Sequence, residues 1–140
     1  MTVDARAAKD DVLARLRAVI KTYDGEIPQD DPPPVDGDGR VRPYTVLYVN
    51  PGSAYATTVC DTPRDMAWGF QVTCVGGDPD RCLWAVTKAR TALTGARLTV
   101  DGARSGLLAE TLDRVFVRRD DEPTPSRHYA PIQYGVDLTG

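Results

Sequence analysis

The stretch Cys74–Asp80, with the sequence CVGGDPD, lies where a strand pattern gives way to a helix pattern, a common position for phosphate-binding loops. It lacks both the GxxxxGKS/T and the GxGxxG patterns. Asp78 also stands at the expected start of the helix, where its carboxylate would repel a phosphate. The sequence therefore argues against a nucleotide site, and we expect no cofactor.

Candidate nucleophiles and bases are few. Cys60 is the one cysteine expected in a loop, and neither it nor any loop serine lies in a nucleophile-elbow pattern. His128, the only histidine, follows Ser126 by two residues, without a carboxylate placed to orient it. Cys60, Cys74 and Cys82 form no CxxC pair, and the carboxylates lack DxDxDG spacing. We therefore expect no catalytic and no metal-ligating residues; an enzyme would have to depend on His128 and Cys60.

Composition narrows the class of protein. The chain has 140 residues, of which 41% are hydrophobic, enough for a single globular domain with its own core. Seventeen Lys and Arg against twenty Asp and Glu give a net charge of -3, which disfavours a tightly gripped nucleic acid. The start, MTVDARAAKDD, lacks the apolar core of a signal peptide, and no later run is long enough to span a bilayer. These features favour a soluble cytosolic protein.

The elements that hold these residues centre on the stretch Trp68–Gly95. Apolar residues alternate with Gly, Gln and Thr up to Val75, which predicts a strand with one buried face. Asp78 is suited to cap the following helix and Pro79 to begin it. Gly95 is suited to end that helix. The apolar stripe of the helix is Cys82, Val86, Ala89 and Leu93.

Before this unit, the spacing of apolar residues from Asp4 to Tyr23 predicts an amphipathic helix, which Asp24 and Gly25 end. The segment Pro28–Pro43 is rich in Pro, Asp and Gly, so no regular element is expected there. It is either a solvated loop or an acidic arm that docks on a neighbouring molecule.

Further strands are predicted at Tyr44–Val49, which pairs antiparallel with the central strand after a long excursion, and at Arg97–Val100. A short strand at Val115–Val117 is possible, and the segment Ala103–Asp113 is ambiguous. The last strand is Ala130–Leu138, in which Pro131 indicates a strand end or an edge.

The predicted architecture is therefore α+β: a single domain over residues 1–140 with a four- to five-stranded, largely antiparallel sheet and two helices packed on one face. Because only two helices are available, the second face is either solvated or buried against other subunits. Gln71 and Thr73 lie on that second face. Trp84 projects to the side of its helix opposite the apolar stripe, so either a loop of the same chain covers it or it anchors a protein interface.

Four segments together resemble one family: YTVLYVNPG, MAWGFQVTCVGGDPDRCLWAVTKARTALTG, VDG and VRRDDEPTPSRHYAPIQYGV. They resemble the tail terminator (tail completion) proteins of long-tailed bacteriophages, particularly those that infect actinobacteria. The acidic insertion Pro28–Pro43 and the segment Ala103–Asp113 have no counterpart in this resemblance. The resemblance implies a non-enzymatic structural protein of the virion. Such a protein forms a hexameric ring on the head-proximal end of the tail tube, stops tube polymerisation and joins the tail to the head connector.

The implied partners are other copies of this chain, the tail tube protein and the head-tail connector protein, with DNA only as passing cargo and no membrane. The implied location is the head-tail junction of the virion, and the host cytoplasm during assembly. We expect the acidic segment Pro28–Pro43 and a basic group to meet across subunit or ring contacts, and we expect Trp84 and the second sheet face to supply further contact surface. The candidate interface residues are Trp84, Gln71, Thr73, Asp30, Asp31, Asp36, Asp38, Arg114, Arg118 and Arg119. A head-side connector component of the same virion is the nearest alternative, followed by a small cytosolic enzyme or a binding module.

Overall fold

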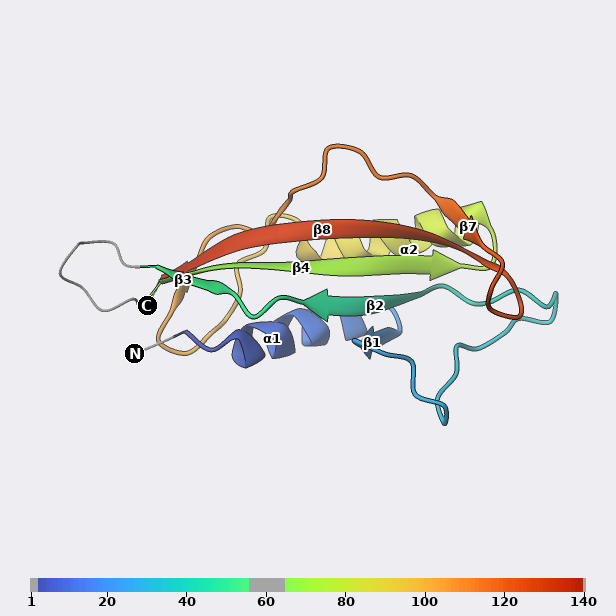
Figure 1. Ribbon diagram of the computed structural model, residues 1–140, viewed down its shortest axis with the longest axis horizontal. Coiled ribbons are helices and arrows are strands. Elements are labelled where there is room, and N and C mark those ends of the chain that lie inside the picture. Colours follow the sequence, from blue (N-terminus) through green and yellow to red (C-terminus); the bar gives the residue numbers. More distant parts are fainter. Residues whose placement is uncertain (1–2, 56–64, 140) are drawn as a thin grey trace.

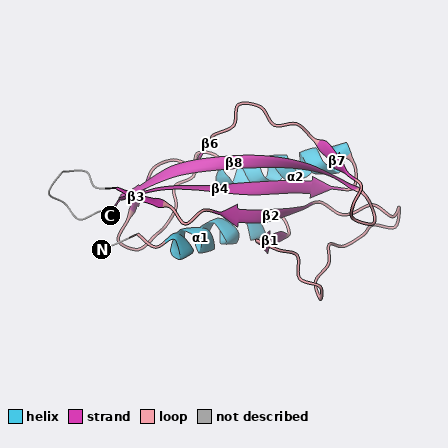
Figure 2. Ribbon diagram, viewed as in Figure 1, coloured by secondary structure: helices cyan, strands magenta, loops and turns pink. Residues whose placement is uncertain are grey.

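The computed structural model describes residues 3–55 and 65–139 as two helices against one large sheet (Figure 1). Figure 2 shows the same view by element type. The helices are α1 (Ala5–Arg17) and α2 (Pro79–Leu93). The strands are β1 (Thr22–Asp24), β2 (Tyr44–Val49), β3 (Ser53–Tyr55), β4 (Asp65–Gly76), β5 (Arg104–Ser105), β6 (Ala109–Glu110), β7 (Arg118–Asp120) and β8 (Arg127–Thr139).

Two long strands, β4 and β8, form the middle of the sheet. They pair antiparallel along their length, from Met66 opposite Leu138 to Gly76 opposite His128. β2 and β3 pair with the other side of β4, and the three short strands β5, β6 and β7 pair with β8. Within residues 3–55 and 65–139 the sheet thus has eight strands, more than the four or five predicted, and β1 pairs parallel to β2. All its other pairs are antiparallel, as predicted.

A proline lies inside β8 because the sheet is locally open beside it. The N–H of Thr111 donates to the carbonyl of Gln133, so the odd-numbered residues of β8 direct their backbone polar groups away from β4. Pro131 is one of these, and its missing N–H faces the side where residues 112–117 arch away from the strand (Figure 1). The arch spans six residues where β8 has three, 130–132, and therefore cannot pair with it. Pro131 marks a local edge within a strand rather than a strand end.

Both helices pack on one face of the sheet, as predicted. The even-numbered residues of β4 and β8, from Met66 to Cys74 and from Ala130 to Leu138, meet the apolar stripes of α1 and α2 in one core. The boundary predicted for the first helix is wrong: α1 ends at Arg17. Tyr23 is buried because it belongs to β1, on the other face of the sheet, and not because it extends the helical stripe.

Two of the weaker strand predictions are also wrong. Residues 97–100 make only an isolated bridge between Arg97 and Leu107, and Val115–Val117 belongs to the arch. The strand of this region is instead the charged β7, whose backbone pairs with β8 while its side chains stay exposed or half-buried. Backbone pairing requires no apolar side chain on a short edge strand, so hydropathy gave no signal for it.

The second face of the sheet has two parts. At one end it is covered by the chain itself, because Tyr23, Tyr44, Val46 and Val75 form a second buried cluster with Val41 of the Pro28–Pro43 segment. The other end is open. No helix among the described residues is long and apolar enough to cross a membrane.

Candidate assembly surfaces

The turn at Cys74–Asp80 is closely packed against the helix and against Val41. A Cβ at Gly76 would overlap the backbone of Arg81 and Cys82, and one at Gly77 would lie 2.7 Å from the nitrogen of Val41. The N–H of Gly77 donates to the carbonyl of Val41 at 3.0 Å. The Asp78 carboxylate caps α2 by accepting from the N–H of Arg81 at 2.7 Å. The two glycines therefore allow close packing of β4, α2 and the segment that contains Val41.

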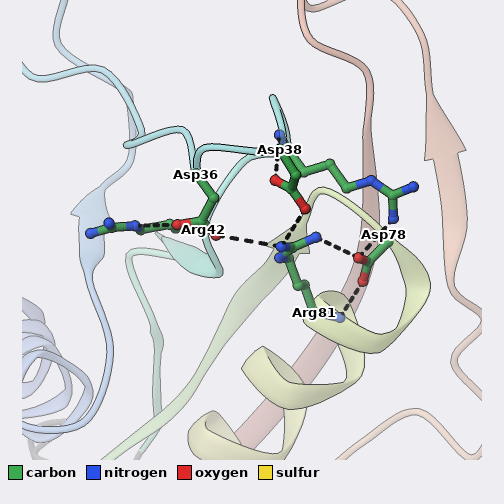
Figure 3. A network of polar contacts seen from close by, with 6 residues as sticks. Asp36, Asp38, Arg42, Asp78 and Arg81 are labelled. Carbon is green, nitrogen blue, oxygen red and sulfur yellow. Dashed lines mark hydrogen bonds and ion pairs between the residues drawn. The ribbon is translucent and has the colours of Figure 1, made fainter.

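One arginine at the start of α2 holds the acidic segment in place (Figure 3). The guanidinium of Arg81 contacts Asp38 at 2.8 Å, Asp36 at 3.6 Å and Asp78 at 2.6 Å. The hydrogen bond from Arg81 lowers the pKa of Asp38 below its ordinary value. The pKa of Asp78 is lowered chiefly by the backbone N–H of Arg81. Residues 35–42, which we call the arm, are therefore docked on the chain's own helix.

The arm is also braced by its own arginines. Arg42 pairs with Asp36 at 2.6 Å, and Arg40 pairs with Asp78 at 3.0 Å. An antiparallel bridge joins Val35 to Val41 and closes a small loop. The arm is thus not a freely solvated loop. Its carboxylates, Asp36 and Asp38, are already paired within one molecule.

Loss of Arg81 should release the arm. In Arg81→Met the apolar stem remains while the bonds to Asp36, Asp38 and Asp78 are lost, so we expect several-fold faster cleavage within residues 35–42 by trypsin in limited proteolysis. Arg6→Met is the matched control, because Arg6 is exposed at the start of α1, and it should leave the cleavage rate unchanged. Equal cleavage of both variants would contradict the docking role of Arg81.

Acid should release the arm as well. The folded-state pKa values of Asp38 and Asp78 are depressed, so their stabilisation is present above their ordinary pKa of about 4 and is lost as the pH falls through the lower folded values. We expect the Gly77 amide, bonded to Val41, to lose hydrogen-exchange protection below about pH 4, after correction for intrinsic rates. The amide of Val72, in the middle of β4, is the internal control. Constant protection of Gly77 from pH 6 to pH 2.5 would contradict the ion-pair origin of docking.

The other predicted acidic residues lie outside the arm. Asp31 pairs with the Nζ of Lys21 at 2.9 Å, and Asp30 is exposed. Among the predicted basic residues, Arg119 pairs with Asp121 at 2.6 Å. Arg114 and Arg118 are exposed and line a small pocket of about 260 Å³ under the arch, together with Phe116 and Pro131. Within one molecule, Asp31 and Arg119 are therefore paired with other side chains. The remaining residues of the two groups outside the arm, Asp30, Arg114 and Arg118, are exposed.

The residues considered for catalysis show no nucleophile-base contact in the described part of the chain. Burial raises the pKa of the Cys82 thiol to about 11, and burial raises that of Cys74 further. His128 lies at the start of β8 opposite Gly76, and its buried Nδ1 has no hydrogen-bond partner among the described residues. Cys60 lies outside the described residues.

Trp84 lies on the outer side of α2 and is 48% exposed, so no described loop covers it. The Nζ of Lys88 lies 5.2 Å from the centre of its ring, within cation-π range. Leu83, 51% exposed, is its neighbour and was missed by the sequence reading. The only signal for it was its adjacency to Trp84 outside the apolar stripe. We call Leu83, Trp84 and Lys88 the α2 patch.

The open end of the second face is a broad groove of about 970 Å³. Gln71 lies on its floor: its amide accepts from Gln133 at 3.1 Å and donates to Thr73 at 2.9 Å. Gly69 and Gly135 lie opposite each other on β4 and β8, next to these hydrogen-bonded side chains. We call this region the sheet groove; its other lining residues with exposed or half-buried surface include Tyr48, Asn50, Ala67, Leu107, Thr111 and Asp137.

Comparison with solved structures shows a likeness in fold, whereas the other comparisons found no match. No family model and no curated protein matches the chain. Among solved structures, a chain of the "Virion of native gene transfer agent (GTA) particle" superposes with a TM-score of 0.61, over 97% of this chain and 97% of that chain. The two sequences are 18% identical over the superposition, so the likeness establishes a shared fold.

Proposed function

We propose that this chain is a structural protein of a phage-like virion that forms a ring on the head-proximal end of the tail tube. In this role it ends tube polymerisation and joins the tail to the head connector. The observation that carries the proposal is the superposition, over nearly the whole of both chains, on a chain from a virion particle. The resemblance of the sequence to tail terminator proteins supports the finer role, at the head-tail junction, for a single tail-terminator-like domain.

The described surface is suited to assembly rather than to catalysis. It combines the exposed α2 patch, the sheet groove, and the charged arm and β7, which lie at the same end of the molecule (Figure 1). Ring subunits associate head-to-tail through two different surfaces. We propose that the interface residues include Trp84, Gln71 and Thr73. The net charge of -3 is also compatible with a channel through which DNA passes without being held.

Deletion of the gene in the particle-producing host tests the proposal. Electron microscopy should show filled heads that lack tails, together with unattached tails of uncontrolled length, and the wild-type gene supplied from a plasmid should restore whole particles. Mass spectrometry of purified particles should detect the chain in a few copies per tail. Unattached tails of normal length would indicate the head-side connector role instead. Absence of the chain from purified particles would overturn both roles.

The basic group near the arch is proposed to contact the acidic segment of a neighbouring subunit or ring. Reversal of Arg114, Arg118 and Arg119 to Glu removes three positive charges from an exposed surface, so we expect it to abolish ring or tube-end binding at ordinary salt. Co-sedimentation with purified tail tubes measures this loss. Arg6→Glu is the control for a charge change elsewhere on the surface. Undiminished assembly of the triple variant would show that the acidic and basic groups do not meet.

A further inference from the structure

Two partly apolar surfaces of this molecule lie on opposite sides of it. The inner stripe of α2 packs on the helix-covered face of the sheet, so the α2 patch points away from the sheet. The sheet groove lies on the second face, which does not carry the helices. The two surfaces therefore cannot meet within one molecule. A two-fold dimer would cover only one of them, whereas a head-to-tail arrangement covers both.

The floor of the groove provides a place for a flat ring. Gly69 and Gly135 face each other on adjacent strands and carry no side chain. Two side chains lean over this pair: the Asn50 amide lies 3.2 Å from the Cβ position of Gly69, and a methyl of Thr111 lies 3.0 Å from that of Gly135. Both must turn aside slightly to admit a ring, and they then border it. An indole on this floor would contact the methyl group and the amide on its two sides. Trp is the side chain most often found at the centre of such contacts.

The two surfaces carry opposite charges. Asp137 lies about as far from the glycine pair as Lys88 lies from Trp84. Asp137 is the charged residue among the described residues that line the groove, and it lies two positions after Gly135 on β8, about 7 Å away. Lys88 lies four positions after Trp84 on α2, so the two side chains start about 6 Å apart on the same face of the helix. A tryptophan on the glycine pair thus brings the lysine to the aspartate.

We propose that the α2 patch of one copy seats in the sheet groove of the next copy, with Trp84 on the Gly69–Gly135 pair and Lys88 facing Asp137. This interface rests on the proposed ring function and specifies its subunit contact. Leu83 then packs against Leu107 or Tyr48 on the rim of the groove, both of which are exposed in the single chain. A contact of ordinary size would bury about 800 Å² on each copy.

Cross-linking in assembled particles tests the contact directly. Lys88→Cys and Asp137→Cys are combined in a Cys60→Ser background, where the remaining thiols, Cys74 and Cys82, are buried. Mild oxidation should then give a ladder of covalent oligomers of this chain on a non-reducing gel, ending at the closed ring. Each single cysteine variant should stay monomeric. A chain that stays monomeric in assembled particles, or a single variant that forms dimers or joins a different protein, would overturn the proposal.

A charge swap provides an independent test. Lys88→Glu and Asp137→Lys should each lower the yield of infectious or transducing particles at least tenfold, because each places like charges in the contact. The double variant should recover most of the yield. No recovery, with both single variants folded by circular dichroism, would contradict the Lys88–Asp137 pairing. If the gene deletion gives the tail phenotype but cross-linking and rescue fail, only this interface is wrong; if the chain is absent from particles, the proposed function itself is wrong.

Discussion

The Gly76→Ala variant is expected to lose about 3 kcal/mol of unfolding free energy through the addition of one methyl group. Gly76 ends β4 beneath the first turn of α2, and an added Cβ would overlap the nitrogen of Cys82 and the carbonyl carbon of Arg81. These are backbone atoms of the helix, so relief requires moving α2 away from the sheet rather than turning a side chain. The loss is a large part of the roughly 5–15 kcal/mol that stabilises a domain.

Urea unfolding monitored by tryptophan fluorescence measures this loss, and Gly37→Ala is the matched control. No atom lies within 4 Å of the Cβ position of Gly37, and its φ is not in the left-handed region. We therefore expect Gly37→Ala to change stability by less than about 1 kcal/mol, with a slight gain possible because alanine restricts the unfolded chain. A Gly76→Ala midpoint equal to that of the control would show that the strand-helix junction is not close-packed.

The Phe70→Ala variant should lose more, about 3–5 kcal/mol. Phe70 is 5% exposed in the middle of β4. Its ring lies 5.0 Å from that of Trp68 and 5.4 Å from that of Tyr134, centre to centre, so truncation leaves a cavity between two aromatic rings. At such a cost the variant is expected to unfold at the lowest urea concentrations or to accumulate as insoluble protein.

The chain offers its own control for this truncation, because Phe116 is its only other phenylalanine. Phe116 lies in the arch and is 64% exposed, so Phe116→Ala should change the free energy of unfolding by less than about 0.5 kcal/mol. Similar midpoints for the two variants would mean that the aromatic cluster is not the centre of the core.

The central unit of the fold could be predicted from sequence because its signals are local. The alternation before Gly76 predicts β4, the Asp78–Pro79 cap predicts the start of α2, and the observed element begins at that cap. Tyr44–Val49 is likewise a strand with the predicted bounds. In each case the signal, either the spacing of apolar side chains or a helix cap, lies within a few consecutive residues.

The remainder depends on contacts between distant residues. β7 is a strand because Arg118–Asp120 pairs with the start of β8, not because its own residues favour one. The arm is ordered by Arg81, about forty residues further on, so its composition alone could not distinguish a solvated loop from a docked arm. Tyr23 fitted a helical stripe until its pairing with Val46 placed it in β1. Sequence patterns show the periodicity of an element. They do not show which distant residues it will contact.

The same is true of the candidate surfaces. Trp84 was identified because a large aromatic residue departs from the stripe of its helix, and the structure places it at the surface. The second face was anticipated only through Gln71 and Thr73. The groove also needs Leu107, which lies between β5 and β6, and Asp137, which lies on β8, and the pairing of these strands has no local signal.

The pairing of β4 with β8 also governs how fast this chain folds. Its partners are 52 residues apart at Gly76 and His128 and 72 apart at Met66 and Leu138, so the middle of the sheet closes only after a long search. The pairing of β2 with β4, whose partners are 21 to 31 residues apart, and the β4-turn-α2 unit can form earlier, because their contacts are closer in sequence. Folding on the scale of roughly milliseconds to seconds follows. Newly made chains would thus expose an unpaired β4 edge until β8 pairs with it, a period in which chaperone binding and low concentration protect them from aggregation.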